Sequence, residues 1–224
     1  MKFSNVLIFF ILNLIFIGES SANSFYSTYP ELIKKGQLVS KDDYKKIKIK
    51  SYFSDGEIYY YKDDDSYYEL KVLPDGVIMM RDPETDIANF GQADSSNFSN
   101  DFWQSLCTKD EITDAITCMV SNKTMTILHT YGRQMISPVQ DINNLDLSKK
   151  HFTRIDTNPA ISANGVVENP KYGQIIAQMK SGKVIKTRYF DIKGTQHDNS
   201  SSLGGFKYAY EYAKKMKEEL KKSY

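Results

Sequence analysis

The chain has 224 residues, in which 29 Lys and Arg stand against 28 Asp and Glu, giving a formal net charge of +1 at pH 7. This near balance argues against a nucleic-acid-binding protein, because such proteins present strongly basic surfaces to phosphate. Tyr is the commonest aromatic residue, with 16 copies. Tyrosine and β-branched residues favour strands, so the composition indicates a β-rich protein.

The first 22 residues have the layout of a secretory signal peptide. Lys2 gives a short positive start, residues 6–18 are mostly apolar, and Ser20 and Ala22 are the two small residues of a cleavage site. The apolar stretch is shorter than the roughly 20 residues that a membrane-spanning helix needs. We therefore expect cleavage after Ala22 and a periplasmic or secreted protein that does not span the membrane.

Cys107 and Cys118 are the only cysteines. A disulfide persists in an oxidising, extracytoplasmic compartment, so this even pair predicts a structural Cys107–Cys118 bridge. The pair lacks the C-x-x-C spacing of redox proteins. It also lacks neighbouring ligands at the spacing of a zinc site.

The segment after the leader predicts a β-meander. Strand-like segments alternate with turn residues, at 45–53, 57–62, 67–73 and 77–81. In the turn Pro74-Asp75-Gly76, Pro sets φ and Gly permits a positive φ. Residues 82–100 are polar and irregular, and we expect a long loop there.

The following segment predicts a second group of strands. FWQSLC, ITCMV and TMTILHTYG, which begin at residues 102, 116 and 124, have strand-like composition. Residues 140–160 are again polar, which indicates another loop. The region 173–192 then predicts a hairpin around Ser181-Gly182, with Lys186 and Arg188 directed away from the core.

The end of the chain predicts an α-helix from about Leu203 to Lys221 that packs on one face of the 173–192 hairpin. Apolar residues recur there at helical spacing, namely Phe206, Ala209, Tyr210, Ala213, Met216 and Leu220. A membrane-surface helix is the alternative reading of such a stripe. We expect Trp103, Phe206, Tyr210, Ala213 and Met216 to be buried.

Together these segments predict an all-β fold, an antiparallel β-sandwich-like domain closed by a C-terminal α-helix. Residues 23–224 would form a single exported domain. Within it, residues 45–97 would be a meander extension of a main part that covers residues 98–224.

Motifs of catalysis are scarce. The histidines have no metal-binding spacing, and neither a nucleophile elbow nor a nucleotide-binding glycine motif occurs. The sequence therefore predicts no catalytic residue, no cofactor and no metal. If the protein were an enzyme, the first candidates would be His129 and Arg133 with Asp141, or His197 with Asp191.

Lys186 and Arg188 are the candidate binding residues. One role for Arg188 is structural, in an ion pair with Asp191 or Glu211. The other is to hold an anionic group through its fork of N–H donors. Both roles remain open at the level of the sequence.

The second half of the chain resembles the invasion-associated locus B (IalB-like) proteins of bacteria. The resemblance covers about residues 98–215 and lies in a W-x-x-x-C…C element, a later glycine turn and a closing "GF…A" helix. The matching positions are Trp103, Cys107, Cys118, Gly182, Gly205, Phe206 and Ala209. It implies an exported, β-sandwich-like protein linked to host interaction, without catalytic residues to carry over.

We expect a non-enzymatic binding or interaction protein, with a protein partner at a host or envelope surface. This expectation follows from the predicted export, the β-rich composition and the lack of a recognisable set of acid–base catalytic residues. The alternative is a periplasmic inhibitor or regulator of an envelope enzyme. It would place the 82–100 loop in the cleft of its partner.

Overall fold

The computed structural model describes residues 37–38, 58–63, 66–92 and 102–222. They divide into two compact units, Met1–Phe102 and Trp103–Tyr224. The predicted signal peptide and the strand predicted at 45–53 lie outside the described residues. Among the described residues, no helix is both long and apolar enough to cross a membrane.

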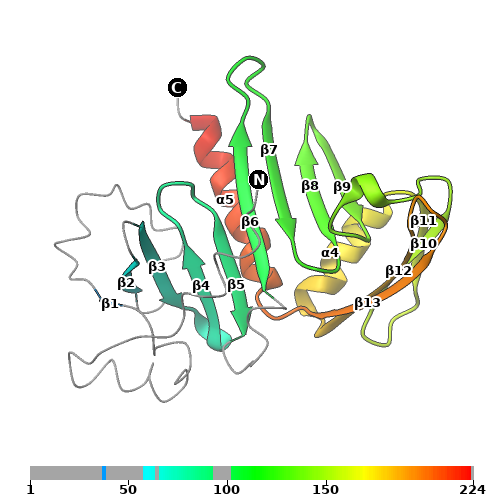
Figure 1. The fold of residues 1–224 in the computed structure, drawn as a ribbon, viewed down its shortest axis with the longest axis horizontal. Helices are drawn as coiled ribbons and strands as arrows, with labels where there is room; N and C mark the ends of the chain where they lie inside the picture. Colours follow the sequence, from blue (N-terminus) through cyan, green and yellow to red (C-terminus); the bar gives the residue numbers. More distant parts are fainter. Residues whose placement is uncertain (1–36, 39–57, 64–65, 93–101, 223–224) are drawn as a thin grey trace. The chain divides into compact units, whose positions relative to one another are not determined.

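The first unit is an antiparallel meander in which each strand pairs with the next (Figure 1). Its strands are β1 (Gln37–Leu38), β2 (Ile58–Asp63), β3 (Ser66–Val72), β4 (Val77–Arg81) and β5 (Ala88–Gln92). The predicted turn before β4 is present, and Asp75 and Gly76 both have positive φ, 69° and 71°. The prediction of an unbroken 82–100 loop is wrong. The ANFGQ segment has weak strand propensity but forms β5 because it pairs with β4 and buries Ala88 and Phe90.

The second unit begins with four consecutive antiparallel strands. They are β6 (Trp103–Lys109), β7 (Ile116–Ser121), β8 (Thr126–Thr130) and β9 (Arg133–Ser137). The strands predicted in this part are therefore confirmed. Cys107 and Cys118 lie directly opposite each other on β6 and β7 and form the predicted disulfide.

A second sheet in this unit has the strand order β11-β10-β12-β13, all antiparallel. Its strands are β10 (Lys150–Ile155), β11 (Ile161–Asn164), β12 (Val184–Phe190) and β13 (Gln196–Ser202). The 140–160 loop prediction is wrong at residues 150–155, which form β10. The core face of β10 includes the polar residues His151 and Thr153 beside Ile155, so its hydrophobic alternation is weak in the sequence.

Helix α4 (Lys171–Ser181) overturns the predicted 173–192 hairpin. Its buried residues are Tyr172, Ile175, Ile176 and Met179, which share one helical face. The short segment QIIAQM fits a strand and a helix equally, and packing against β9, β10 and the C-terminal helix decides for the helix.

Gly182 is therefore a helix C-cap and not a hairpin turn. Its N–H donates to the Gln178 carbonyl over 2.8 Å. A Cβ at this position would lie 2.4 Å from Cγ2 of Ile155 on β10. The backbone of the cap thus approaches the second sheet so closely that no side chain fits.

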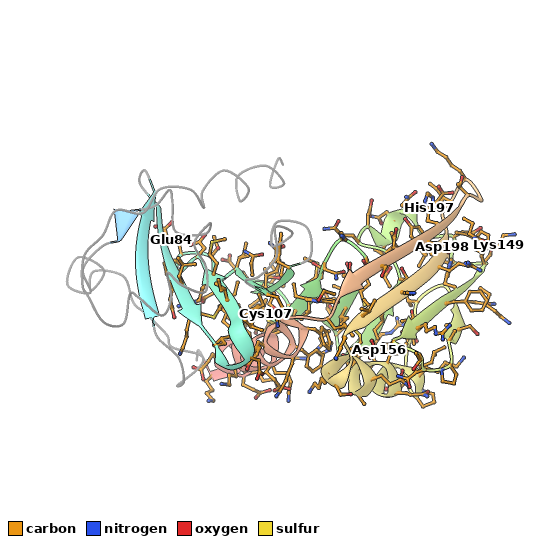
Figure 2. The ribbon with its side chains drawn as sticks, turned by 90° about the horizontal axis from the view of Figure 1, so that it is seen from below. Glu84, Cys107, Lys149, Asp156, His197 and Asp198 are labelled. Atoms are coloured by element: carbon orange, nitrogen blue, oxygen red, sulfur yellow. A yellow bond between two sulfur atoms is a disulfide. The ribbon has the colours of Figure 1, made fainter. Side chains whose placement is uncertain are left out.

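Asp156 fixes the chain just after this cap. Its carboxylate accepts hydrogen bonds from the N–H groups of Lys183 and Val184, at 2.9–3.1 Å. Figure 2 shows Asp156 next to α4. The end of α4 and the start of β12 are therefore tied to the end of β10.

The C-terminal helix α5 (Phe206–Lys222) confirms the predicted helix, and all five residues expected to be buried are buried. It lies along β6 and β7, and not on the second sheet as predicted (Figure 1). Trp103 meets Phe206 edge to face, with ring centroids 4.8 Å apart. The fold is thus mainly antiparallel β-sheet with a C-terminal α-helix, as the sequence predicted.

The hairpin turns that follow β4 and β6 are built in the same way from the sequences RDPETDI and KDEITDA. In each, the first Asp (Asp82 or Asp110) accepts hydrogen bonds from the Thr backbone N–H and hydroxyl three residues later. The second Asp (Asp86 or Asp114) has positive φ and pairs with the basic residue at the end of the strand. The two units therefore share one short hairpin design, which the matched turn residues specify.

We expect Phe206→Ala to destabilise the second unit by roughly 3–5 kcal/mol, because the ring is fully buried against Trp103. Denaturant unfolding of the exported protein measures this, with the exposed neighbour Lys207→Ala as the control. A silent Phe206→Ala would contradict the docking of α5 on β6.

We expect Gly182→Ala to cost about 1–3 kcal/mol, because the new methyl group would overlap Ile155. The double variant with Ile155→Ala, which removes the Cγ2 methyl group that the new side chain would meet, should lose less stability than the sum of the two single variants. Additive losses in the double variant would show that the clash is not the cause.

Candidate functional site

The exposed face of the second sheet carries a groove with a volume of about 470 Å³. Six of its lining residues, on three neighbouring strands, form two rows, and we call this set the sheet groove. In one row Phe152, Arg188 and Asp198 are cross-strand neighbours, and in the other Arg154, Lys186 and Ser200 are. Alternation along the strands places these six on the face opposite the core residues Thr153, Ile155 and Ile185.

The second row concentrates positive charge. Arg154 and Lys186 lie directly opposite each other on β10 and β12. Within the described residues neither forms an ion pair, and the Arg154 guanidinium donates only a long, 3.4 Å hydrogen bond to the Thr157 carbonyl. Like charges directly opposite in an antiparallel pair are destabilising, so this row has two cations that the fold itself leaves uncompensated.

The first row is charge-balanced. The Arg188 guanidinium donates from Nε and Nη2 to the two carboxylate oxygens of Asp198, over 2.6 and 2.8 Å. These hydrogen bonds hold the pKa of Asp198 below its usual range, so the pair is ionised at neutral pH. Both side chains remain about half exposed, at 51% and 54%. The pair is therefore a fixed and accessible fork of donors beside a carboxylate.

The partners predicted for Arg188 are thus wrong. Glu211 pairs with Lys180, and Asp191 pairs with His197, whereas Asp198 faces Arg188 across the β12–β13 ladder. The predicted exposure of Lys186 and Arg188 is confirmed. Arg154 and Phe152 were not among the predicted binding residues, because the segment that contains them was predicted to be a loop. The alternation of Phe152 and Arg154 with Thr153 and Ile155 was the available signal.

Of the two residue sets considered for catalysis, the structure brings together His197 and Asp191. Nε2 of His197 lies 2.9 Å from Oδ2 of Asp191, and the imidazole stacks on Tyr189 with centroids 4.9 Å apart. Asp191 also accepts hydrogen bonds from the N–H groups of Lys193 and Thr195. Among the described residues no hydroxyl or thiol is hydrogen-bonded to His197, so the pair closes the β12–β13 turn without a nucleophile.

The other set, His129 with Arg133 and Asp141, does not assemble. Arg133 pairs with Glu168, and Asp141 caps the short 3₁₀ turn by accepting from the Asn143 N–H. His129 instead lies in the core, where its Nε2 is hydrogen-bonded to the Tyr172 hydroxyl.

A buried polar network surrounds His129. The Tyr172 hydroxyl lies 3.1 Å from the Tyr210 hydroxyl, so the network joins β8, α4 and α5. Burial, together with the positive charges of Lys217 and Lys214, lowers the pKa of His129 to about 4. His129 is therefore neutral at neutral pH and serves to connect these three elements.

No group of three or more His, Cys, Asp or Glu side chains in the described part of the chain is arranged to hold a metal ion. No protein-family model, characterised protein or solved structure matches the chain. The functional argument therefore depends on the geometry and charge of the sheet groove.

The buried His129 should make the stability of the protein depend on pH. Its pKa is about 4 in the folded protein and close to 6.5 in the unfolded chain. The unfolded chain therefore binds the proton first, and stability falls as the pH falls from 6.5 towards 4. A shift of this size corresponds to a loss on the order of 3 kcal/mol.

Denaturant unfolding between pH 7 and pH 4 tests this loss. We expect His129→Gln to be less stable at pH 7 but to lose the slope between pH 6.5 and 4. The control His197→Gln removes a partly exposed histidine and should keep that slope. An unchanged slope in His129→Gln would contradict the assignment to His129.

Proposed function

We propose that the protein is an exported, non-enzymatic binding protein that holds an anionic ligand in the sheet groove. The observation that carries this proposal is the Arg154–Lys186 pair, two directly opposed cations for which the described part of the fold supplies no carboxylate. A ligand anion between them would relieve their repulsion and accept charge-assisted hydrogen bonds from both.

The neighbouring residues support the same role. Arg188 retains unused N–H donors after its two bonds to Asp198, and Ser200 adds a hydroxyl next to Lys186. The long side chains project from adjacent strands of a hydrogen-bonded sheet, so their bases are held in a fixed arrangement. Sites built on such elements hold their geometry better than sites on loops.

Export and the host or envelope setting belong to the proposal as well. They are supported by the signal-like N-terminus, the disulfide and the resemblance to IalB-like proteins. An anionic cell-surface or envelope ligand would be accessible to a protein in that compartment.

Binding to immobilised dextran sulfate, with neutral dextran as the blank, tests the proposal. We expect retention that weakens as salt rises, because the contacts are charged. Arg154→Gln and Lys186→Gln should each weaken binding by roughly tenfold or more, the size expected for one lost hydrogen bond to a charged group. Lys207→Gln, which removes one charge from the exposed face of α5, should bind as the parent does.

Thermal unfolding of the same variants separates a binding role from a structural one. Because Arg154 and Lys186 repel each other, Lys186→Gln should leave the melting temperature unchanged or raise it. A lower melting temperature would mean that Lys186 stabilises the fold. Unchanged dextran sulfate binding by the Arg154→Gln, Lys186→Gln double variant would refute the sheet groove as the site.

A further inference from the structure

The composition of the sheet groove points to the class of ligand. We propose that it binds an acidic sugar chain, with a sulfate or uronate group between Arg154 and Lys186 and a sugar ring against Phe152 and the Arg188–Asp198 pair. This inference rests on the proposed function and names the ligand of the same site.

The first argument is the place of the carboxylate. Asp198 is exposed to 54% and lies in the row next to the two free cations. A uniformly anionic polymer, such as polyphosphate or a run of acidic residues, would bring charge against this carboxylate along with the cations. A sugar chain alternates anionic groups with neutral hydroxyls, so one unit can satisfy the cations while the next meets Asp198.

The second argument is hydrogen-bonding capacity. Each carboxylate oxygen of Asp198 accepts one bond from Arg188 and keeps further lone pairs, and the guanidinium uses two of its N–H donors. The pair therefore offers acceptors and donors side by side. Neighbouring sugar hydroxyls, which both donate and accept, match that arrangement, and the Ser200 hydroxyl extends it to the cationic row.

The third argument is the aromatic residue. Phe152 is partly exposed on an otherwise charged face, directly opposite Arg188 and two residues from Arg154 along β10. Residues two apart in a strand are about 7 Å apart, which is comparable with the length of one sugar ring. The apolar C–H face of a sugar ring can pack on Phe152 while its acidic substituent reaches Arg154.

The last argument is the shape of the site. The groove crosses three strands on the open face of the sheet, and the Arg188 side chain remains 51% exposed. Small-molecule sites enclose most of their ligand, which this face does not. A chain that continues beyond the groove in both directions fits such a surface.

Calorimetric titration of the exported protein with four defined probes tests the inference. The probes are a heparin hexasaccharide, a hyaluronan hexasaccharide, a polyphosphate and an oligoglutamate, the last two matched in charge to the heparin probe. We expect at least one hexasaccharide to bind tenfold or more tightly than both non-sugar polyanions. Preference for heparin assigns the sulfate, and preference for hyaluronan assigns the uronate.

Two variants sharpen the test. Phe152→Leu keeps an apolar side chain but removes the flat ring, and should weaken hexasaccharide binding several-fold while leaving polyphosphate binding unchanged. Asp198→Asn removes the carboxylate charge, and should strengthen polyphosphate and oligoglutamate binding while reducing the preference for sugar. Unchanged thermal unfolding verifies that both variants are folded.

The outcomes separate the two proposals. If no probe binds, or if Lys186→Gln changes nothing, both the anion site and the sugar assignment fail. If polyphosphate or oligoglutamate binds as tightly as the hexasaccharides and depends on Lys186, the anion site stands and the sugar assignment is overturned. Oligoglutamate alone as the ligand would indicate an acidic protein partner.

Discussion

The second unit depends on the close contact between α5 and the β6–β7 hairpin. Ala209 and Ala213 are small enough for the helix backbone to reach the sheet. The Ala209 carbonyl accepts a hydrogen bond from the Ser105 hydroxyl over 2.6 Å, and the Ala213 carbonyl lies 3.3 Å from the Cys107 sulfur. The disulfide locks the two strands at that point. Figure 2 shows Cys107 beside α5. A larger residue at either alanine would force the helix away from both strands.

A series of buried contacts connects this helix–sheet contact to the sheet that carries the groove. Tyr210 on α5 is hydrogen-bonded to Tyr172 on α4, and α4 packs on β10. The α4 cap at Gly182 then leads directly into β12. The Arg154–Lys186 and Arg188–Asp198 pairs consequently occupy a sheet that is held from behind by a continuous set of buried contacts.

The two faces of that sheet differ in how their polar and charged side chains are paired. The core face pairs or buries its polar groups, as His151 does by bonding to the Phe190 N–H and the Asp146 carbonyl. The exposed face instead opposes two cations across a ladder, where an Asp, Glu, Ser or Thr at either position would be more favourable. Residues that lower stability without a compensating interaction elsewhere in the fold are expected at functional positions.

Local sequence determined the features that need only neighbours along the chain. The turns at 74–76, 82–87 and 110–115 follow from Pro, Gly, Asp and Thr at fixed positions, and α5 follows from its apolar stripe. Short β-prone segments bounded by turn residues located β2, β3 and β4, alternation located β12, and the even cysteine pair specified the disulfide.

Tertiary structure decided the elements whose local signals were weak or ambiguous. QIIAQM became α4 because a helix buries Ile175, Ile176 and Met179 against its neighbours, and β5 and β10 formed because partner strands supply their hydrogen bonds. The sequence by itself determined that Lys186 and Arg188 would be exposed. Only the pairing of β10 with β12 and of β12 with β13 placed Arg154 and Asp198 beside them, since cross-strand register depends on residues far apart in the chain.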